Sequence, residues 1–295
     1  MNGIVDAHHH IWRQKDLPWL SGPMLPRIFG PYELIRRDYP ISEYLADISK
    51  SDVTRSVYVQ ANWAREDFEA EVRWVQQTAE ASGWPHGIVG YADLLVDDVR
   101  PQLDRLKPYT LLRGIRMQLH WHDNPQYRFA ARPDLLREPV FRRNMAYLAD
   151  YGLSFDLQVF TSQMADATDL AAEFPRTTFI LQHAGMLEDL SPQGWAAWRA
   201  GMAQLARQPN VVSKLSGLGT FVHKIDGVLI AEIVRETIGL FGPERCLFGS
   251  NFPIEKLWAS YDELIAAHRA ALAGYSPADQ AMILAGTAMR VYRLG

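Results

Sequence analysis

Cysteine is nearly missing from this sequence of 295 residues, in which Cys246 is the only one. A single cysteine excludes an intrachain disulfide and is typical of proteins in the reducing cytoplasm. No apolar run approaches the length that crosses a membrane, and the N-terminus lacks the basic and apolar segments of a secretory signal. We therefore expect a soluble, cytoplasmic protein.

An excess of charge of one sign is also absent, because 30 Lys and Arg residues face 34 Asp and Glu residues. The net charge of −4, with basic residues spread along the chain, argues against nucleic acid and anionic membranes as partners. A hydrophobic content of 48% is ordinary for a globular protein. We expect a small-molecule substrate, and the sequence gives no indication of the oligomeric state.

Eight short apolar or β-branched runs are predicted strands: residues 4–10, 55–60, 87–92, 112–120, 153–160, 178–183, 211–215 and 246–250. Segments with a helical period separate or follow them: residues 41–49, 66–82, 99–106, 140–151, 162–174, 193–207, 229–241, 261–272 and 277–292. Strand–helix alternation repeated eight times predicts an α/β fold, a (β/α)₈ TIM barrel formed by residues 1–295 as one domain.

Two predicted loops are too long to be simple turns. Residues 13–40, after the first strand, contain five prolines and several aromatic side chains, and residues 121–133, after the fourth strand, contain Arg128 and Arg132. Long loops in compact domains are often lids over functional sites. Because both follow a strand, we expect both at the face of the barrel where active sites are built.

The first strand carries the pattern Asp6-x-His8-x-His10. Side chains alternate along a strand, so this spacing predicts Asp6, His8 and His10 on one face and His9 on the other. Two imidazoles two residues apart can offer two nitrogens to one metal ion or substrate. A remnant of an expression tag and a hydrogen-bonded pair of core histidines are the alternatives.

Polar residues also stand near the carboxyl ends of five later strands: Arg116, Gln118 and His120; Asp156 and Gln158; His183; Lys214 and Ser216; Ser250 and Asn251. Polar side chains on so many strand ends are hard to explain by stability alone and predict one site at the rim. We expect Arg116, Gln118, His120, Gln158, Lys214 and Trp121 to bind the substrate. For Lys214, a structural ion pair is the alternative, and Ser216 is expected to stabilise its own turn rather than act as a nucleophile.

Six segments occur in an order that resembles the amidohydrolase superfamily. They are Asp6-x-His8-x-His10, Arg113-Gly114-Ile115-Arg116, residues 152–157 (Gly-Leu-Ser-Phe-Asp-Leu), the strand end at His183, residues 214–218 (Lys-Leu-Ser-Gly-Leu) and Phe248-Gly249-Ser250-x-Phe252-Pro253. The most similar branch is the amidohydrolase-2 group of sugar-lactone and pyrone-dicarboxylate lactonases.

The resemblance implies a distorted barrel that hydrolyses a small lactone, either a sugar lactone or a carboxylated lactone, in small-molecule catabolism. It also implies that His8, His10 and His183 bind a metal ion or the substrate, and that Arg116 binds a substrate carboxylate or hydroxyl. The resemblance is compatible with two states of the site. These imidazoles could bind Zn²⁺ or another divalent metal, or the site could work without a metal.

Position 251 departs from the family pattern, which has an aspartate as general base at the end of the eighth strand. Asn251 cannot take a proton from water at neutral pH, although it can accept and donate hydrogen bonds. The sequence therefore assigns the base to an imidazole, either His183 or one of His8, His10 and His120, with Asn251 orienting the reactants. An imidazole base predicts that kcat/KM rises through a pKa of about 6 to 7.

Two other functions fit the same residues. The first is a metal-dependent decarboxylase or hydratase that acts on a small carboxylate, for which Arg116, Arg128 and Arg132 would be suitable. The second is a non-catalytic binding protein that lost its base at position 251. Product analysis separates the first from a lactonase, because only the lactonase adds water and opens a ring.

Overall fold

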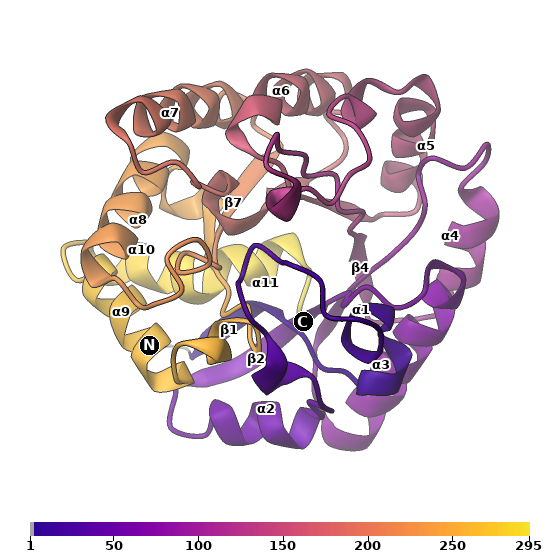
Figure 1. Ribbon diagram of the computed structural model, residues 1–295, viewed down its shortest axis with the longest axis horizontal. Helices are drawn as coiled ribbons and strands as arrows, with labels where there is room; N and C mark the ends of the chain where they lie inside the picture. Colours follow the sequence, from indigo (N-terminus) through magenta and orange to yellow (C-terminus); the bar gives the residue numbers. More distant parts are fainter. Residues whose placement is uncertain (1–2) are drawn as a thin grey trace.

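All eight predicted strands form, and each pairs in parallel with the next one along the chain. The structure is a computed structural model that describes residues 3–295. Its strands are β1 (Ile4–His9), β2 (Val53–Val59), β3 (Gly87–Gly90), β4 (Leu112–Ile115), β5 (Ser154–Leu157), β6 (Phe179–Leu181), β7 (Val211–Leu215) and β8 (Cys246–Phe248). They form a nearly closed barrel surrounded by helices, which confirms the predicted TIM-barrel fold (Figure 1).

The outer layer consists of the helices that connect successive strands. They are α2 (Ile41–Asp47), α3 (Phe68–Ser82), α4 (Arg100–Leu106), α5 (Pro139–Asp150), α6 (Met164–Glu173), α7 (Pro192–Ala206) and α8 (Gly227–Phe241), and α9 (Tyr261–Leu272) follows β8. Local sequence defines their ends: Ser260 and Glu263 form a capping box at the start of α9, and α3 stops at Gly83, whose φ is 79°. In the described part of the chain, no helix is long and apolar enough to cross a membrane.

Several strands are shorter than predicted, because the chain leaves the sheet before the polar residues are reached. Strand β4 ends before Arg116, β6 before His183 and β8 before Asn251. The loop after β1 contains a short helix, α1 (Pro18–Ser21), which the proline-rich sequence did not predict. The predicted helix over residues 277–292 is divided into α10 (Pro277–Ala281) and α11 (Thr287–Val291) by a π-helical turn.

The C-terminal segment closes the amino-terminal end of the barrel. Tyr292 and Leu294 pack in a buried cluster with apolar residues from the barrel interior, such as Val5 and Val212. Arg293 donates a hydrogen bond to the carbonyl oxygen of Gly152, just before β5. With this end closed, the carboxyl ends of the strands are the open end of the barrel, where the polar residues lie.

Strand β1 contains a bulge, since two of its residues lie opposite one residue of β2 between Asp6 and His9. Both flanking residues therefore turn toward the outer helices: the Asp6 carboxylate contacts the Tyr44 hydroxyl, and the His9 ring stacks on the Tyr44 ring. The prediction that Asp6 shares a face with His8 and His10 is thus wrong. Simple alternation fails at a bulge, which the sequence alone does not reveal.

The Asp6 carboxylate joins the first strand to the last. Its Oδ1 accepts hydrogen bonds from the backbone N–H groups of Ser250 (2.8 Å) and His8 (3.1 Å). Its Oδ2 accepts from the hydroxyls of Ser250 (2.6 Å), Tyr44 (2.9 Å) and Tyr261 (3.1 Å). Burial raises the pKa of Asp6, and several of these hydrogen bonds oppose the rise. One side chain therefore connects β1, the end of β8, α2 and α9.

Backbone hydrogen bonds also join the first strand to the chain that follows the last strand; this junction is called the seam. The N–H of Asn251 donates to the carbonyl oxygen of His8 (2.7 Å), and the N–H of His10 donates to that of Phe252 (2.7 Å). The chain beyond β8 thus continues alongside β1. As a consequence, Asn251 lies next to His8, and Phe252 lies next to His10.

We predict that Asp6→Ala destabilises the protein by about 3–5 kcal/mol, because several buried donors lose their acceptor. Urea unfolding followed by circular dichroism measures the change. Asp52→Ala is the control: Asp52 pairs with Arg269 at the surface, its side chain is 72% exposed, and its loss should cost less than about 1 kcal/mol. Equal effects of the two substitutions would contradict the role of Asp6.

Candidate active site

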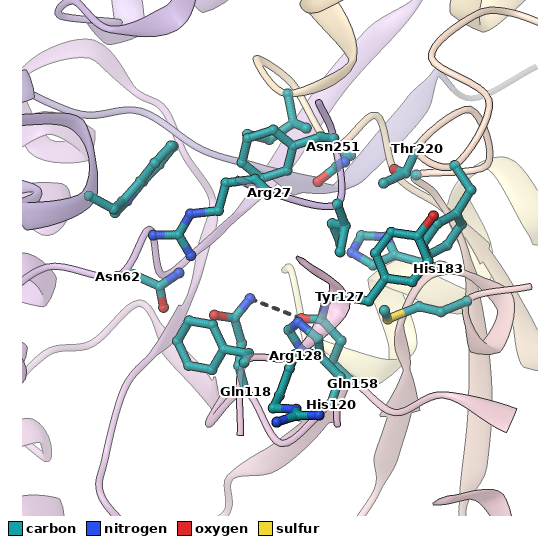
Figure 2. Close-up of a pocket in the computed structure, with 18 of the residues that line it drawn as sticks. Arg27, Asn62, Gln118, His120, Tyr127, Arg128, Gln158, His183, Thr220 and Asn251 are labelled. Carbon is teal, nitrogen blue, oxygen red and sulfur yellow. Dashed lines mark hydrogen bonds between the residues drawn. The ribbon is translucent and has the colours of Figure 1, made fainter. Parts of the chain in front are cut away.

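A cavity opens at the carboxyl ends of the strands, and Figure 2 shows side chains from several loops around it. Its volume is about 910 Å³ with the open mouth included. Three arginines, three histidines and five side-chain amides line it, whereas none of the Asp and Glu residues within residues 3–295 does. This is the position at which TIM-barrel enzymes build their active sites.

Three imidazoles meet at the inner end of this cavity. The ring centroid of His8 lies 5.0 Å from that of His10 and 4.9 Å from that of His183. His10 and His183 line the cavity, and the fully buried His8 lies behind them with no hydrogen-bond partner for either ring nitrogen. His10 Nδ1 lies 2.7 Å from the carbonyl oxygen of Val59, so it carries the proton and leaves Nε2 as an acceptor.

Burial keeps these imidazoles neutral. It lowers the pKa of His8 and His10 well below the usual value, with further lowering by the charges of Lys214 and Arg116. The pKa values of His120 and His183 are lowered to about 3, again mainly by burial. This does not fit the sequence-based expectation of an imidazole base that titrates at about 6 to 7. A weakly basic imidazole is well suited to holding reactants through hydrogen bonds.

His183 is held in an unusual backbone turn. The φ angles of His183, Ala184 and Met186 are 54°, 48° and 54°, a left-handed conformation that costs energy for residues with a side chain. His183 Nδ1 lies 2.9 Å from the hydroxyl oxygen of Ser216. A side chain at Gly217 would approach the imidazole to 2.6 Å, so the glycine provides the space for the ring. The turn after β6 is therefore organised around the imidazole.

Lys214 lies beneath the cavity and does not line it. Its Nζ donates to Asp156 Oδ2 (2.8 Å) and contacts the Tyr292 hydroxyl (2.9 Å), with both charged side chains fully buried. Asp156 also accepts from Gln182 Nε2 (2.8 Å), and Gln182 Oε1 accepts from Arg116 Nη1 (3.1 Å). The expected substrate contact of Lys214 does not match this position. A buried ammonium group needs a counter-ion, which Asp156 supplies.

Arg116 reaches the cavity from the end of β4. One of its terminal nitrogens donates to the carbonyl oxygen of Gln60, the other to Gln182, and its Nε has no partner. Burial lowers its pKa to about 10, so the guanidinium stays charged at neutral pH. A fixed, buried cation of this kind can stabilise a carboxylate or an oxyanion.

Most of the other expected binding residues also line the cavity. Gln118 Nε2 donates to Gln158 Oε1 (3.1 Å), the dashed line in Figure 2, and His120 lies beside them with Nδ1 unpaired. Trp121 does not line the cavity. Its ring centroid lies 4.9 Å from the guanidinium carbon of Arg128, so it supports a lining residue through a cation–π contact.

The two long loops meet above the cavity. Gln126 of the second loop donates from Nε2 to the carbonyl oxygen of Arg27 in the first loop (3.2 Å). His223, in the connection after β7, lies with Nε2 3.2 Å from the carbonyl oxygen of Ile28. These contacts make an ordered cover over the site, which agrees with the prediction of lids.

Sequence reasoning missed several lining residues, among them Arg27, Asn62, Tyr127 and Thr220. Arg27 and Tyr127 lie in the two loops that the sequence singled out, which was the only signal for them. The direction of a side chain in an irregular loop follows no period, so pattern analysis cannot place it.

Asn251 lies at the end of β8 and lines the cavity. Its φ of 58° is left-handed, a conformation that asparagine and aspartate adopt more readily than other residues with a side chain. Its carbonyl oxygen accepts from the N–H of Ile254 (2.9 Å) and that of Glu255 (3.3 Å). The backbone at this position is therefore fixed independently of the side-chain amide.

The imidazoles of His8, His10 and His183 do not form a preorganised metal site. Within residues 3–295, no group of three or more His, Cys, Asp or Glu side chains could hold a metal ion. The set contains no carboxylate, and the positive charges of Lys214 and Arg116 that lower the pKa of His8 also oppose a divalent cation. The residues present therefore do not fit a tightly held metal ion.

The sequence profile of a family described as amidohydrolase matches residues 5–294. The chain belongs to the amidohydrolase family. This confirms the resemblance inferred from the ordered motifs.

The uncharacterised protein y4mH of Sinorhizobium fredii is 36% identical over 99% of this chain and 98% of its own length. The L-fucono-1,5-lactonase of Burkholderia multivorans is 29% identical over 98% of this chain and 96% of the relative. A crystal structure of a Burkholderia multivorans amidohydrolase with bound zinc is 28% identical, covers 99% of both chains and superposes with a TM-score of 0.83. The family match and the lactonase-named relative support a hydrolase enzyme.

We predict that Asn251→Gly lowers kcat/KM on the order of 10²-fold, because the amide that orients the reactants is lost. Glycine adopts the left-handed φ without strain, so the melting temperature should stay close to that of the wild type. Steady-state kinetics and calorimetry measure the two effects. Full activity of this variant would contradict a role for the amide.

Proposed function

We propose that this amidohydrolase hydrolyses a small lactone in the cavity at the open end of the barrel. The single observation that carries the proposal is a cavity rich in hydrogen-bond donors, with arginine, histidine and amide side chains and no Asp or Glu of the described residues in its lining. Such donors are suited to the carbonyl, hydroxyl and carboxylate oxygens of a small cyclic ester. The relatives named lactonases support the same reaction class.

The charge of the cavity favours a lactone that carries a carboxylate over a neutral sugar lactone. None of the lining arginines, Arg27, Arg116 and Arg128, forms an ion pair with a residue between 3 and 295. Arg132, which the sequence also suggested, instead pairs with Asp134 at the surface. Unpaired guanidinium groups in a confined site bind carboxylates with strong, directed hydrogen bonds.

In the proposed reaction, Arg116 stabilises the negative charge that develops on the lactone carbonyl oxygen as water attacks. His183, His10 and Asn251 hold the water and the carbonyl group, and His8 supports the two imidazoles from behind. These assignments rest on the lining of the cavity and on the convergence of the three rings.

The remaining residues have binding or indirect roles. Gln118, Gln158 and His120 bind ring hydroxyls, because their polar atoms lie together along one wall. Trp121 holds Arg128 in position, and Lys214 neutralises the Asp156 carboxylate that anchors Gln182 below Arg116.

A decarboxylase or hydratase is the second candidate, because the same arginines suit its carboxylate substrate. Product analysis decides between the two: a lactonase yields a ring-opened acid with one added water, whereas a decarboxylase releases carbon dioxide. A non-catalytic binding protein is the third candidate. In that case Asn251→Asp should create activity, whereas an enzyme adapted to asparagine should lose activity with aspartate at this position.

We predict that the chain prefers carboxylated lactones, and that Arg27→Gln lowers kcat/KM for them roughly 10- to 100-fold, as expected for one lost charged hydrogen bond. The same variant should leave kcat/KM for a neutral sugar lactone nearly unchanged. Acid release from matched charged and neutral lactones, followed with a pH indicator, measures both values. An equal loss on both substrates would contradict carboxylate recognition by Arg27.

Zinc or another divalent metal would have His8, His10 and His183 as its ligands and would polarise the carbonyl and activate water. Because the donor set does not fit a tightly held ion, we derive no step through a metal. We predict that kcat/KM is retained after dialysis against a chelator, with elemental analysis before and after as the readout. Loss of activity that Zn²⁺ restores would overturn this prediction.

A further inference from the structure

A buried carboxyl group lies just behind the cavity wall, at Glu255. It follows β8 by a few residues, is fully buried and does not line the cavity. Its Oε2 accepts from Trp258 Nε1 (2.9 Å), and its Oε1 accepts from the hydroxyl of Thr220 (3.4 Å). A side chain at Gly219 would approach Oε2 to 3.0 Å, so the loop after β7 leaves space for this carboxyl.

No cation compensates this buried carboxyl among residues 3–295. The neighbouring Lys256 pairs with Glu43 and Asp47, and Lys224 pairs with Asp226. Trp258, which donates to Glu255, packs its ring 5.7 Å from the ring of His223. Burial raises the pKa of Glu255 to about 7, and hydrogen bonds from Trp258, Asn251 and Thr220 limit the rise.

An unpaired carboxyl in the interior is costly to keep and contributes little to stability. A group whose pKa lies near neutral pH can, however, exchange a proton under working conditions. The imidazoles of the site lack this property, because their pKa values lie far lower.

Thr220 and Asn251 connect Glu255 to the cavity. Both line it, and Figure 2 shows both side chains on the same side of the cavity. The Thr220 hydroxyl can accept one proton while it donates its own, whereas the Asn251 amide can only hold a water molecule by hydrogen bonds. A path for a proton therefore runs from the cavity through Thr220 to Glu255.

We propose that Glu255, acting through the hydroxyl of Thr220, accepts the proton of the attacking water in place of the aspartate that position 251 lacks. The inference rests on the proposed lactone hydrolysis. As the water oxygen bonds to the carbonyl carbon, its proton passes to Thr220 Oγ1 and the Thr220 proton passes to Glu255. When the ring C–O bond breaks, the proton returns by the same path to the leaving alkoxide. The net change is the addition of one water.

The pH dependence of kcat/KM tests this role, because a merely structural carboxyl would not move it. In the wild type, kcat/KM should rise as the pH rises through about 7, since only the ionised carboxylate accepts a proton. We call this rising part of the pH profile the limb. Glu255→Gln should abolish this limb and lower kcat/KM roughly 10²- to 10⁴-fold, the usual effect of losing a general base.

Thr220 and Trp258 provide matched variants. Thr220→Val has nearly the same shape without the hydroxyl and should abolish the limb, whereas Thr220→Ser keeps the hydroxyl and should retain it. Trp258→Phe removes a hydrogen bond that lowers the pKa of Glu255, so the limb should move to higher pH.

A second buried glutamate serves as the control. Burial also raises the pKa of Glu71 to about 7, but its carboxylate accepts from Tyr58 and from the N–H of Ala61 and does not line the cavity. Glu71→Gln should leave the position of the limb unchanged. Infrared difference spectra across the same pH range should contain a buried carboxyl band that Glu255→Gln removes.

The outcomes are distinguishable. A wild type that opens none of the lactones overturns the proposed function, and the proton path with it. An active wild type whose pH limb persists in Glu255→Gln, or in Thr220→Val, overturns the role of Glu255 alone. Glu255→Gln could fail to fold, as judged by its melting temperature. In that case the comparison of Thr220→Val with Thr220→Ser, and the shift of the pH limb in Trp258→Phe, test the role of Glu255.

Discussion

The closure of the barrel depends on the Asp6 carboxylate. The first and last strands are not joined by a full ladder of hydrogen bonds, and Asp6 connects them through Ser250 while it also accepts from Tyr44 and Tyr261. A carboxylate can accept more hydrogen bonds than any uncharged side chain of its size, which suits it to a junction where several buried donors meet. The same seam brings the backbone of Asn251 to His8. The stability of the fold and the assembly of the site thus share one interaction.

Charge in the interior is arranged so that the cavity is positive and its imidazoles are neutral. Lys214 is compensated directly by Asp156, and Gln182 links that carboxylate to Arg116. No carboxylate of residues 3–295 lines the cavity, so the guanidinium group of Arg116 is available to an anion. Because positive charge and burial both disfavour protonated imidazole, the histidines stay neutral near neutral pH.

Unfavourable backbone conformations gather at the site. His183 and Asn251 both have left-handed φ angles. Each follows a strand of the barrel, and that strand fixes the chain just before the residue. Strain of this kind persists only where the surrounding structure fixes it, and it aims a side chain in a direction that regular strands do not provide. The rigid barrel therefore holds the side chains at the ends of its strands in precise positions. The loops above supply the residues that close the cavity.

The sequence determined the barrel, because eight strand–helix alternations have few other ways to pack, and it determined which strand ends carry polar residues. It also placed His10, Arg116, His183 and Asn251 near one another, since the carboxyl ends of parallel strands meet at one face.

The tertiary structure alone decided the direction of the Asp6 side chain. A one-residue bulge reverses the alternation of side chains along the strand, and no sequence pattern indicates that bulge. It also decided that Lys214 is an ion-pair partner and that Glu255 lies beside Thr220, since both depend on which distant side chains share a buried space. The pKa values of the histidines were likewise decided by the tertiary structure alone. They follow from the depth of burial and the charges around each ring, which exist only once the chain has folded.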